Sequence, residues 1–283
     1  MTLVRTPSRG ARREGSSPLS LCLATLVLAV MLCPIAMIAV MSFSAADNLQ
    51  FPPPGFSLRW YGRAFELAVG WNAEDSVERL SGALGTSLLI AGLTTLAVVA
   101  AGVPAAYALQ RLEFPGKAVI EQMINLPVVF PMVVLGVALL IVFNVLGLEA
   151  GIGRLVLAHS LITLPFMVRN CTAALAAVGR EVEWAAYTLG ADRLRTLLLV
   201  VVPLMKPGII AGMLLAFVIS INEFTVTYFL YSVDAFPLSI WMFSRTASSL
   251  DPTVFALGTI TILFDFAAVW VIERLVGDRG LAI

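Results

Sequence analysis

The chain has 283 residues, of which 59% are hydrophobic and only 13% are charged, and its mean hydropathy is +0.94. A soluble domain carries about 25% charged residues, so this composition excludes an ordinary water-soluble globule and predicts a protein that faces lipid. The formal net charge is zero, which gives no indication of a polyanionic partner such as nucleic acid.

Six stretches are apolar and long enough to cross the hydrocarbon core of a bilayer, which needs about 20 helical residues. Backbone polar groups cannot stay unpaired in lipid, and such long single runs rule out a barrel, so we predict an all-α polytopic membrane protein with six transmembrane helices. The predicted spans are 21–43, 84–110, 121–147, 152–174, 207–231 and 253–275. They divide the chain into an N-terminal tail (1–20), a first helix (21–43), an outer loop (44–83), a five-helix core (84–275) and a C-terminal tail (276–283).

The first apolar run, 21–43, is either a cleaved signal peptide or an uncleaved anchor. Its apolar core of roughly 20 residues exceeds the usual ~7–15 residues of a signal peptide, which favours the anchor.

The loop 44–83 contains Pro52-Pro53-Pro54-Gly55, which stops any helix there, and Trp60, Tyr61 and Trp71, which are typical of an aromatic belt at the membrane surface. We interpret this loop either as a contact surface for an outside partner or as a tether for the first span, and the tether is favoured for most of it.

Basic residues are distributed unequally between the two sets of loops. Of the 18 Lys and Arg residues, 13 lie in the N-terminal tail, in 111–117, in 169–206 and at the C-terminal end, and 5 lie on the opposite side. The positive-inside rule therefore predicts that both termini are cytoplasmic and that the loop 44–83 is periplasmic.

Proline, glycine and histidine mark special positions within the core. Pro127 and Pro131 are expected to kink the third span or to break its hydrogen-bond ladder. Gly208 and Gly212 form a small-xxx-small pattern, which permits close approach to a neighbouring helix. His159, in the outer half of the fourth span, is expected to be a hydrogen-bonded packing residue.

The polar segment between the fourth and fifth spans has a regular pattern. Residues 181–189 have a helical pattern with acidic residues at the start, where the helix dipole favours them. Gly190 is placed to end that helix in a left-handed conformation, and Asp192 is placed to cap the next one. Two short helices at an angle, joined to the two spans, are suited to transmit the movement of a partner. An ordinary solvated loop explains neither the Ala185-Ala186 pair nor Gly190.

No phosphate-binding Gly-rich loop, nucleophile elbow or Cys/His metal pattern occurs in the sequence. We therefore predict no catalytic residue, no metal site and no cofactor.

The segment between the fourth and fifth spans resembles the coupling loop of binding-protein-dependent ABC importer permeases, which is written Glu-Ala-Ala, three residues, Gly, and Leu-Pro about a dozen residues later. Ala185-Ala186, Gly190-Ala191 and Val202-Pro203-Leu204 carry this resemblance. Further similarity lies in 48–61, 104–109, 114–116, 158–160, 164–166 and 217–229. Together these segments are similar to the second-permease form of the spermidine/putrescine branch.

This resemblance implies a type I ABC importer permease fold in a bacterial inner membrane, with a cytoplasmic coupling loop at 175–206. The implied partners are ATP-binding subunits that hydrolyse ATP, a second permease subunit and a periplasmic solute-binding protein that docks on 44–83 and 232–252. The implied coupling residues are Glu183, Trp184, Ala185, Ala186, Gly190, Ala191 and Pro203. The family glutamate falls at Trp184, with Glu183 immediately before it, so either residue is a candidate for its role.

Three polar residues lie inside predicted spans: Asn222 and Glu223 in the fifth, and Asp265 near the middle of the sixth. A charged side chain at the bilayer centre costs at least about 2.5–3.5 kcal/mol, so these groups are expected to face the bundle interior. They either line a path for a cationic solute or form hydrogen bonds between helices. The resemblance implies polyamine-like small solutes, although that branch often carries an acid where Asn222 stands.

Two other functions compete with the importer subunit. A secondary transporter needs an inverted repeat and a coupling-ion site of its own, and the sequence shows no convincing repeat. A membrane assembly subunit without transport activity is opposed only weakly by the acids inside the predicted spans.

Overall fold

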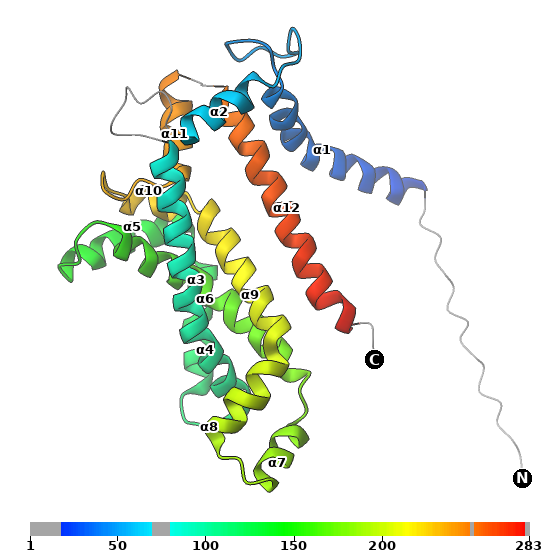
Figure 1. The fold of residues 1–283 in the computed structure, drawn as a ribbon, viewed down its shortest axis with the longest axis vertical. Helices are drawn as coiled ribbons and strands as arrows, with labels where there is room; N and C mark the ends of the chain where they lie inside the picture. The colour runs from blue at the N-terminus through cyan, green and yellow to red at the C-terminus, as the bar shows by residue number, and fades with distance from the viewer. Residues whose placement is uncertain (1–17, 70–79, 250–251, 281–283) are drawn as a thin grey trace, which may run out of the picture.

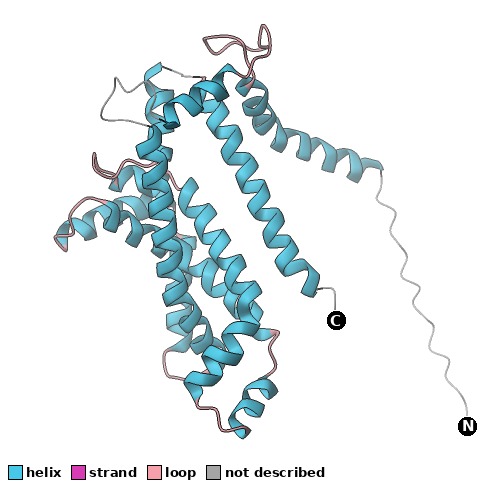
Figure 2. Cartoon of the chain, in the orientation of Figure 1, coloured by secondary structure: helices cyan, strands magenta, loops and turns pink. Residues whose placement is uncertain are grey.

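The computed structural model describes residues 18–69, 80–249 and 252–280, and the regular structure within these ranges is helical (Figure 2). The first 17 residues with their arginines, Trp71, and 281–283 lie outside the described residues. The elements are α1 (Pro18–Ser42), α2 (Arg59–Val69), α3 (Leu80–Arg111), α4 (Lys117–Val129), α5 (Met132–Val145), α6 (Ile152–Ala176), α7 (Arg180–Thr188), α8 (Arg193–Thr196), the π-helix η1 (Leu197–Val201), α9 (Val202–Asn222), α10 (Thr225–Leu230), α11 (Leu238–Ser249) and α12 (Thr253–Gly280).

Five helical stretches are long and apolar enough to cross a membrane, and a sixth is obtained if the bent pair α4 and α5 counts as one span. The five are α1, α3, α6, the continuous run from Arg193 to Asn222, and α12. The all-α membrane fold predicted from the sequence is therefore confirmed. The third predicted span differs from a simple membrane helix, because the chain bends by 112° between its two halves, α4 and α5.

The bend between α4 and α5 follows from Pro131. Proline lacks a backbone N–H and disfavours the helical conformation of the residue before it. Phe130 is accordingly extended, with φ −77° and ψ 142°, and α5 starts again at Met132. The expected break is present, whereas the second proline, Pro127, lies within α4 without ending it.

The packed centre of the molecule is formed by α3, α6 and α9, which run side by side (Figure 1). Gly208 and Gly212 of α9 face α6, and a Cβ atom on Gly208 would lie 2.7 Å from the carbonyl oxygen of Asn170. The predicted close approach at the small-xxx-small pattern is thus confirmed. Gly102 of α3 faces α6 in the same way, with Met167 against it, so glycines on two helices permit the tight packing of the core.

At the end of the bundle that carries α2 and α11, the predicted outer loop contains a helix that hydropathy did not indicate. Trp60 of α2 is buried and donates its indole N–H to the carbonyl oxygen of Ser44 at 2.8 Å. Tyr61 lies 2.7 Å from the hydroxyl of Ser42. The prediction that Trp60 belongs to an exposed aromatic belt is therefore wrong, because its ring packs inside the protein and its polar atom is satisfied there.

Two polar side chains of α6 are buried near the same end. His159 lies 2.8 Å from the Ser220 hydroxyl and 2.9 Å from the Thr227 hydroxyl, so it joins α6 to both α9 and α10. This confirms the predicted packing role. Arg154 is buried in the first turn of α6, and its guanidinium donates to the side-chain oxygen of Asn144.

Large apolar side chains remain exposed along the outside of the bundle, as a lipid-facing surface requires. They include Leu26, Met31, Leu88, Leu96, Val133, Ile141, Leu157, Leu263, Phe266 and Trp270. Helix α1 packs on α12 and leaves the rest of the bundle at an angle (Figure 1).

Candidate functional site: the α7 segment and the polar residues of α9 and α12

The α7 segment, residues 180–192, lies at the end of the bundle opposite α2 and α11 (Figure 1). Helix α7 has Glu181 and Glu183 in its first turn, as predicted, where the positive end of the helix dipole favours carboxylates. It ends in a left-handed glycine, Gly190, with φ +88°. The N–H of Gly190 donates to Tyr187 O at 3.0 Å and that of Ala191 to Ala186 O at 3.1 Å. This pair of bonds satisfies carbonyls that a helix end leaves free, and it confirms the predicted termination.

The second predicted short helix is also present, and it is not separate from the fifth span. Asp192 caps α8 by accepting a hydrogen bond from the N–H of Arg195 at 2.7 Å. Helix α8 then continues through η1 into α9, so that 193–222 forms one uninterrupted helical run. Pro203 explains the π-helical turns. Proline has no N–H to donate to the carbonyl four residues earlier, and its ring clashes with that carbonyl in a regular α-helix.

The two faces of α7 differ in burial. Glu183 and Ala186 are buried, whereas Trp184 is 59% exposed and Ala185 is exposed beside it. Leu189, which follows α7, is 88% exposed. The α7 segment therefore presents Trp184 and Leu189 to its surroundings, while Glu183 points inward and the other acid of the first turn, Glu181, stays exposed.

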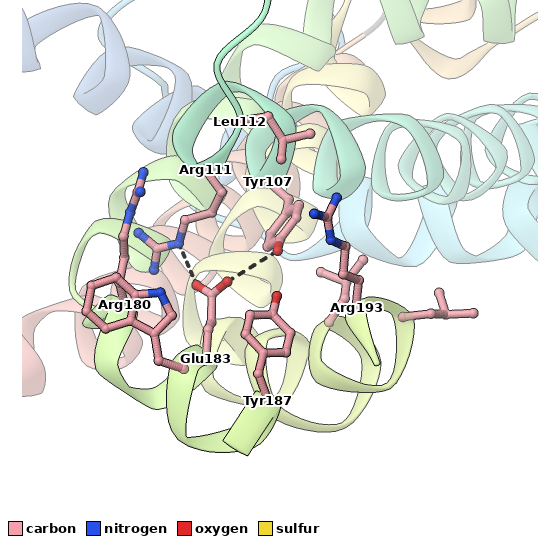
Figure 3. Close-up of a pocket in the computed structure, with 10 residues that line it drawn as sticks. Tyr107, Arg111, Leu112, Arg180, Glu183, Tyr187 and Arg193 are labelled. Carbon is pink, nitrogen blue, oxygen red and sulfur yellow. Dashed lines mark hydrogen bonds and ion pairs between the residues drawn. The ribbon is translucent and has the colours of Figure 1, made fainter. Parts of the chain in front are cut away.

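Glu183 is held by two residues from the last turns of α3 (Figure 3). Its Oε1 accepts from Arg111 Nε at 2.6 Å, and its Oε2 accepts from the Tyr107 hydroxyl at 3.2 Å. The side chains of Arg111 and Glu183 are 8% and 7% exposed, respectively. Arg111 also donates to the carbonyl oxygens of Leu175 and Val178, at 3.3 and 2.5 Å.

Tyr107, Arg111 and Glu183 line a cleft of about 460 Å³ between the end of α3 and the α7 segment. Arg180 and Arg193 lie on either side of the buried pair (Figure 3). The sequence did not indicate Tyr107 or Arg111 as site residues. Their spacing of four on one helix places them on the same face. This spacing indicates that the two side chains are neighbours, but it does not indicate what they contact.

The polar residues inside the predicted spans are brought together only in part. Asn222, the last residue of α9, donates from Nδ2 to Asp265 Oδ1 of α12 at 2.9 Å. Glu223 follows in the break between α9 and α10, and its Oε1 accepts from the N–H of Val226 at 2.8 Å. Asp265 thus has a partner on the neighbouring helix, whereas Glu223 caps the first turn of α10. The end of α9 that precedes Glu223 lies far from the α7 segment along the bundle (Figure 1).

Rings surround the break next to Glu223. Phe224, Tyr228 and Phe243 form a triangle with centroids 5.1 to 5.6 Å apart. Tyr228 and Phe243 are exposed, so exposed aromatic rings lie close along the chain to the carboxylate of Glu223.

The sequence matches the family described as "Binding-protein-dependent transport system inner membrane component" over residues 98–278, which is more than half of the chain. The chain belongs to this family. The matched region contains both the α7 segment and the polar residues at the ends of α9 and α12.

Several relatives have similar lengths. The spermidine/putrescine transport system permease protein PotC of Haemophilus influenzae is 30% identical over 254 residues, covering 90% of this chain and 94% of that protein. The putrescine transport system permease protein PotI of Escherichia coli K12 is 30% identical, covering 81% and 80%. A probable molybdenum ABC transporter permease protein of Haloferax volcanii is 39% identical over a shorter region, covering 58% and 64%.

Solved structures share the fold. A bacterial ABC transporter involved in the import of the acidic polysaccharide alginate has a chain that aligns with a TM-score of 0.64 at 19% identity, covering 90% of this chain and 94% of that chain. The bacterial alginate ABC transporter in complex with alginate pentasaccharide-bound periplasmic protein aligns with a TM-score of 0.62 at 12% identity, covering 91% of each chain. The chain thus has the importer permease fold.

Taken together, these findings make this chain a multi-pass inner-membrane permease subunit of an ATP-driven, binding-protein-dependent importer, and a transport protein rather than an enzyme. They favour neither a secondary transporter nor an assembly subunit without transport activity.

Proposed function

We propose that this chain forms half of a translocation pathway whose α7 segment docks on a separate ATP-hydrolysing subunit. The observation that carries this proposal is the pattern of burial on α7. Trp184 and Leu189 are exposed apolar groups at the end of the bundle, while Glu183 and Ala186 fasten the opposite face. Exposed apolar side chains that lie outside the lipid region are typical of a protein contact. Trp184, rather than Glu183, is therefore the residue that reaches the ATPase.

The distribution of charge supports a cytoplasmic position for the α7 segment and for both termini. Basic residues near this end of the described helices include Arg111, Lys117, Arg180, Arg193, Arg195 and Lys206, with Arg169 and Arg274 in the halves of α6 and α12 nearer their C-terminal ends, and those at the other end are Arg59, Arg63, Arg154 and Arg245. The excess at the α7 end agrees with the positive-inside rule. The opposite end, with α2 and α11, then faces the periplasm and is the surface for the solute-binding protein, and a second permease subunit completes the pathway.

Cysteine crosslinking tests the docking surface. Trp184→Cys and Thr188→Cys, made in a chain whose exposed Cys22 and Cys33 are replaced by Ala, are expected to crosslink to the ATPase in the assembled importer. Phe56→Cys, which is exposed at the opposite end, is the control and is expected to give no such product. If the two α7 positions react no more than Phe56→Cys does, the docking assignment is wrong.

Gly190 provides a second test, because its φ of +88° is accessible to glycine and tolerated by asparagine. Gly190→Pro cannot adopt this conformation and is expected to uncouple ATP hydrolysis from uptake while the bundle remains in the membrane. Gly190→Asn is the matched control and is expected to retain coupling. Normal uptake by Gly190→Pro would contradict a role for the helix termination.

The substrate that we infer is a polyamine-like cation. The relatives that cover most of this chain are named as spermidine/putrescine or putrescine permeases, and Glu223 directly precedes Phe224 of the aromatic cluster. Aromatic faces and carboxylates both attract ammonium groups. The Haloferax relative, named for molybdenum, suggests an oxyanion instead, but it covers only 58% of this chain.

Uptake of labelled spermidine, putrescine and molybdate by the importer assembled with its own binding protein distinguishes these substrates. Glu223→Gln retains an oxygen that accepts from Val226 N–H and removes only the charge, so it is expected to slow polyamine uptake severalfold. Asn222→Ala, which removes a neutral side chain that bonds to Asp265, is the comparison. Unchanged polyamine uptake by Glu223→Gln would indicate that the acid serves only to cap α10.

A further inference from the structure

The carboxylate of Glu183 is engaged within the chain. Arg111 Nε and the Tyr107 hydroxyl each bond to a different oxygen, at 2.6 and 3.2 Å, and the carboxylate and guanidinium are almost fully buried. Removing either partner of such a pair leaves a buried charge uncompensated. Turning Glu183 outward would therefore break this pair and leave the Arg111 guanidinium buried without its partner.

Arg111 joins three helices at one point. Its Nε bonds α7 through Glu183, and its Nη2 donates to the carbonyls of Leu175, in the last turn of α6, and of Val178, just after α6. The C-terminal end of a helix carries partial negative charge, so a guanidinium is well suited to this position. Arg111 itself is the last residue of α3. A lysine has one nitrogen and cannot make the forked set of bonds.

The connection matters because of where it lies in the chain. Glu183 is 72 residues from Arg111 and 76 from Tyr107, whereas the backbone joins α7 directly only to α6 on one side and to α8 on the other. Closely packed backbone neighbours of α7 are α8 and η1. Helix α3, in contrast, packs along both α6 and α9, so a displacement of its end at Arg111 is transmitted to the whole core.

We propose that Arg111, Glu183 and Tyr107 form a mechanical link that transfers movement of α7 into α3 and so couples ATP hydrolysis to opening of the pathway. They are positioning residues, since in this proposal they act by linking α7 to α3. This inference rests on the proposed function, in which α7 docks on the ATPase through Trp184. It adds that movement of α7 reaches α3 through side chains, in addition to reaching α6 and α9 through the backbone.

The test measures solute transported per ATP hydrolysed, with the full importer in proteoliposomes. Glu183→Gln keeps the size and hydrogen-bonding oxygen of the side chain and is expected to lower this ratio at least tenfold. Arg111→Lys is expected to lower it similarly, and Tyr107→Phe by a smaller factor. Both substitutions break the same link. The double variant, Arg111→Lys with Glu183→Gln, is therefore expected to have a transport-to-ATP ratio no lower than that of the more severe single variant.

The matched control is Glu113→Gln. Glu113 pairs with Lys117 at 3.1 Å near the same end of the bundle, but this pair is exposed and joins neighbouring residues. Its transport-to-ATP ratio is expected to equal that of the unaltered protein. Arg111→Lys can also reduce the amount of folded importer, so each ratio is normalised to assembled complex. Glu183→Gln and Tyr107→Phe provide the test if Arg111→Lys does not assemble.

The outcomes separate this inference from the proposed function on which it rests. A normal ratio in Glu183→Gln, with crosslinking from Trp184→Cys to the ATPase retained, overturns the link while docking stands. A lower yield of complex with an unchanged ratio also overturns it, because that result indicates a purely structural role. Loss of crosslinking in the otherwise unaltered chain overturns the docking proposal itself.

Discussion

Gly208 is the position at which one added methyl group should most clearly disturb the core. Helices α9 and α6 approach so closely there that a Cβ atom would lie 2.7 Å from the carbonyl oxygen of Asn170 and would also meet Ala174. The carbonyl belongs to the backbone of α6 and cannot turn aside as a flexible side chain can. Gly208→Ala is therefore expected to push the two helices apart.

The size of this effect follows from the nature of the neighbouring atoms. Overpacking against rigid atoms costs about 1–3 kcal/mol, which lowers the folding equilibrium constant by roughly 5–150-fold. At Gly212 the nearest atom is the thioether sulfur of Met167, at 2.5 Å, and a methionine side chain adapts easily, so Gly212→Ala should cost less. At Gly92 of α3 no heavy atom lies within 4 Å, so Gly92→Ala is expected to be neutral or slightly stabilising, since alanine favours the helix.

Reversible unfolding of the purified subunit in mixed micelles, followed by circular dichroism, measures these differences. The predicted order of destabilisation is Gly208→Ala, then Gly212→Ala, then Gly92→Ala. Equal unfolding free energies for Gly208→Ala and Gly92→Ala would show that the close approach of α9 to α6 does not exist as described.

Two further perturbations have defined magnitudes. Asn144→Ala removes the side-chain oxygen at 2.5 Å from the buried Arg154 guanidinium, and because hydrogen bonds to charged groups contribute about 1.5–3 kcal/mol, the unfolding free energy should fall by that amount. Asp192→Ala removes the cap that accepts from Arg195 N–H, which should cost about 1 kcal/mol and increase amide hydrogen exchange in 193–196. Asn144→Asp is the control for the first variant and should retain stability. Unchanged amide hydrogen exchange in Asp192→Ala would contradict the capping role of Asp192.

The elements that the sequence predicted well depend on local interactions. Helix α7, its left-handed end at Gly190 and the cap at Asp192 involve residues at most five apart, so turn and cap chemistry is sufficient to locate them. The spans were found for a related reason, because each needs only a continuous apolar run. The break at Pro131 was also expected, although its angle of 112° depends on how α5 packs against α10.

What the sequence did not predict depends on contacts between distant segments. The sequence left open whether Glu183 or Trp184 contacts the ATPase, because the partner of Glu183, Arg111, lies 72 residues away in the chain. Helix α2 was missed because its pattern is amphipathic and its mean hydropathy is low, so a search for apolar runs passes over it. Its buried face, with Trp60 and Ala64, becomes evident only beside α3 and α12.

The central claim is that ATP hydrolysed by a separate subunit drives transport through this chain. The most direct measurement is uptake of labelled polyamine into proteoliposomes that contain the two permease subunits and the ATPase, with binding protein outside and ATP inside. Uptake is predicted to require ATP and to stop when the ATPase subunit is omitted or a non-hydrolysable analogue replaces ATP. Uptake that proceeds at the same rate without ATP, or without the ATPase, would contradict the account.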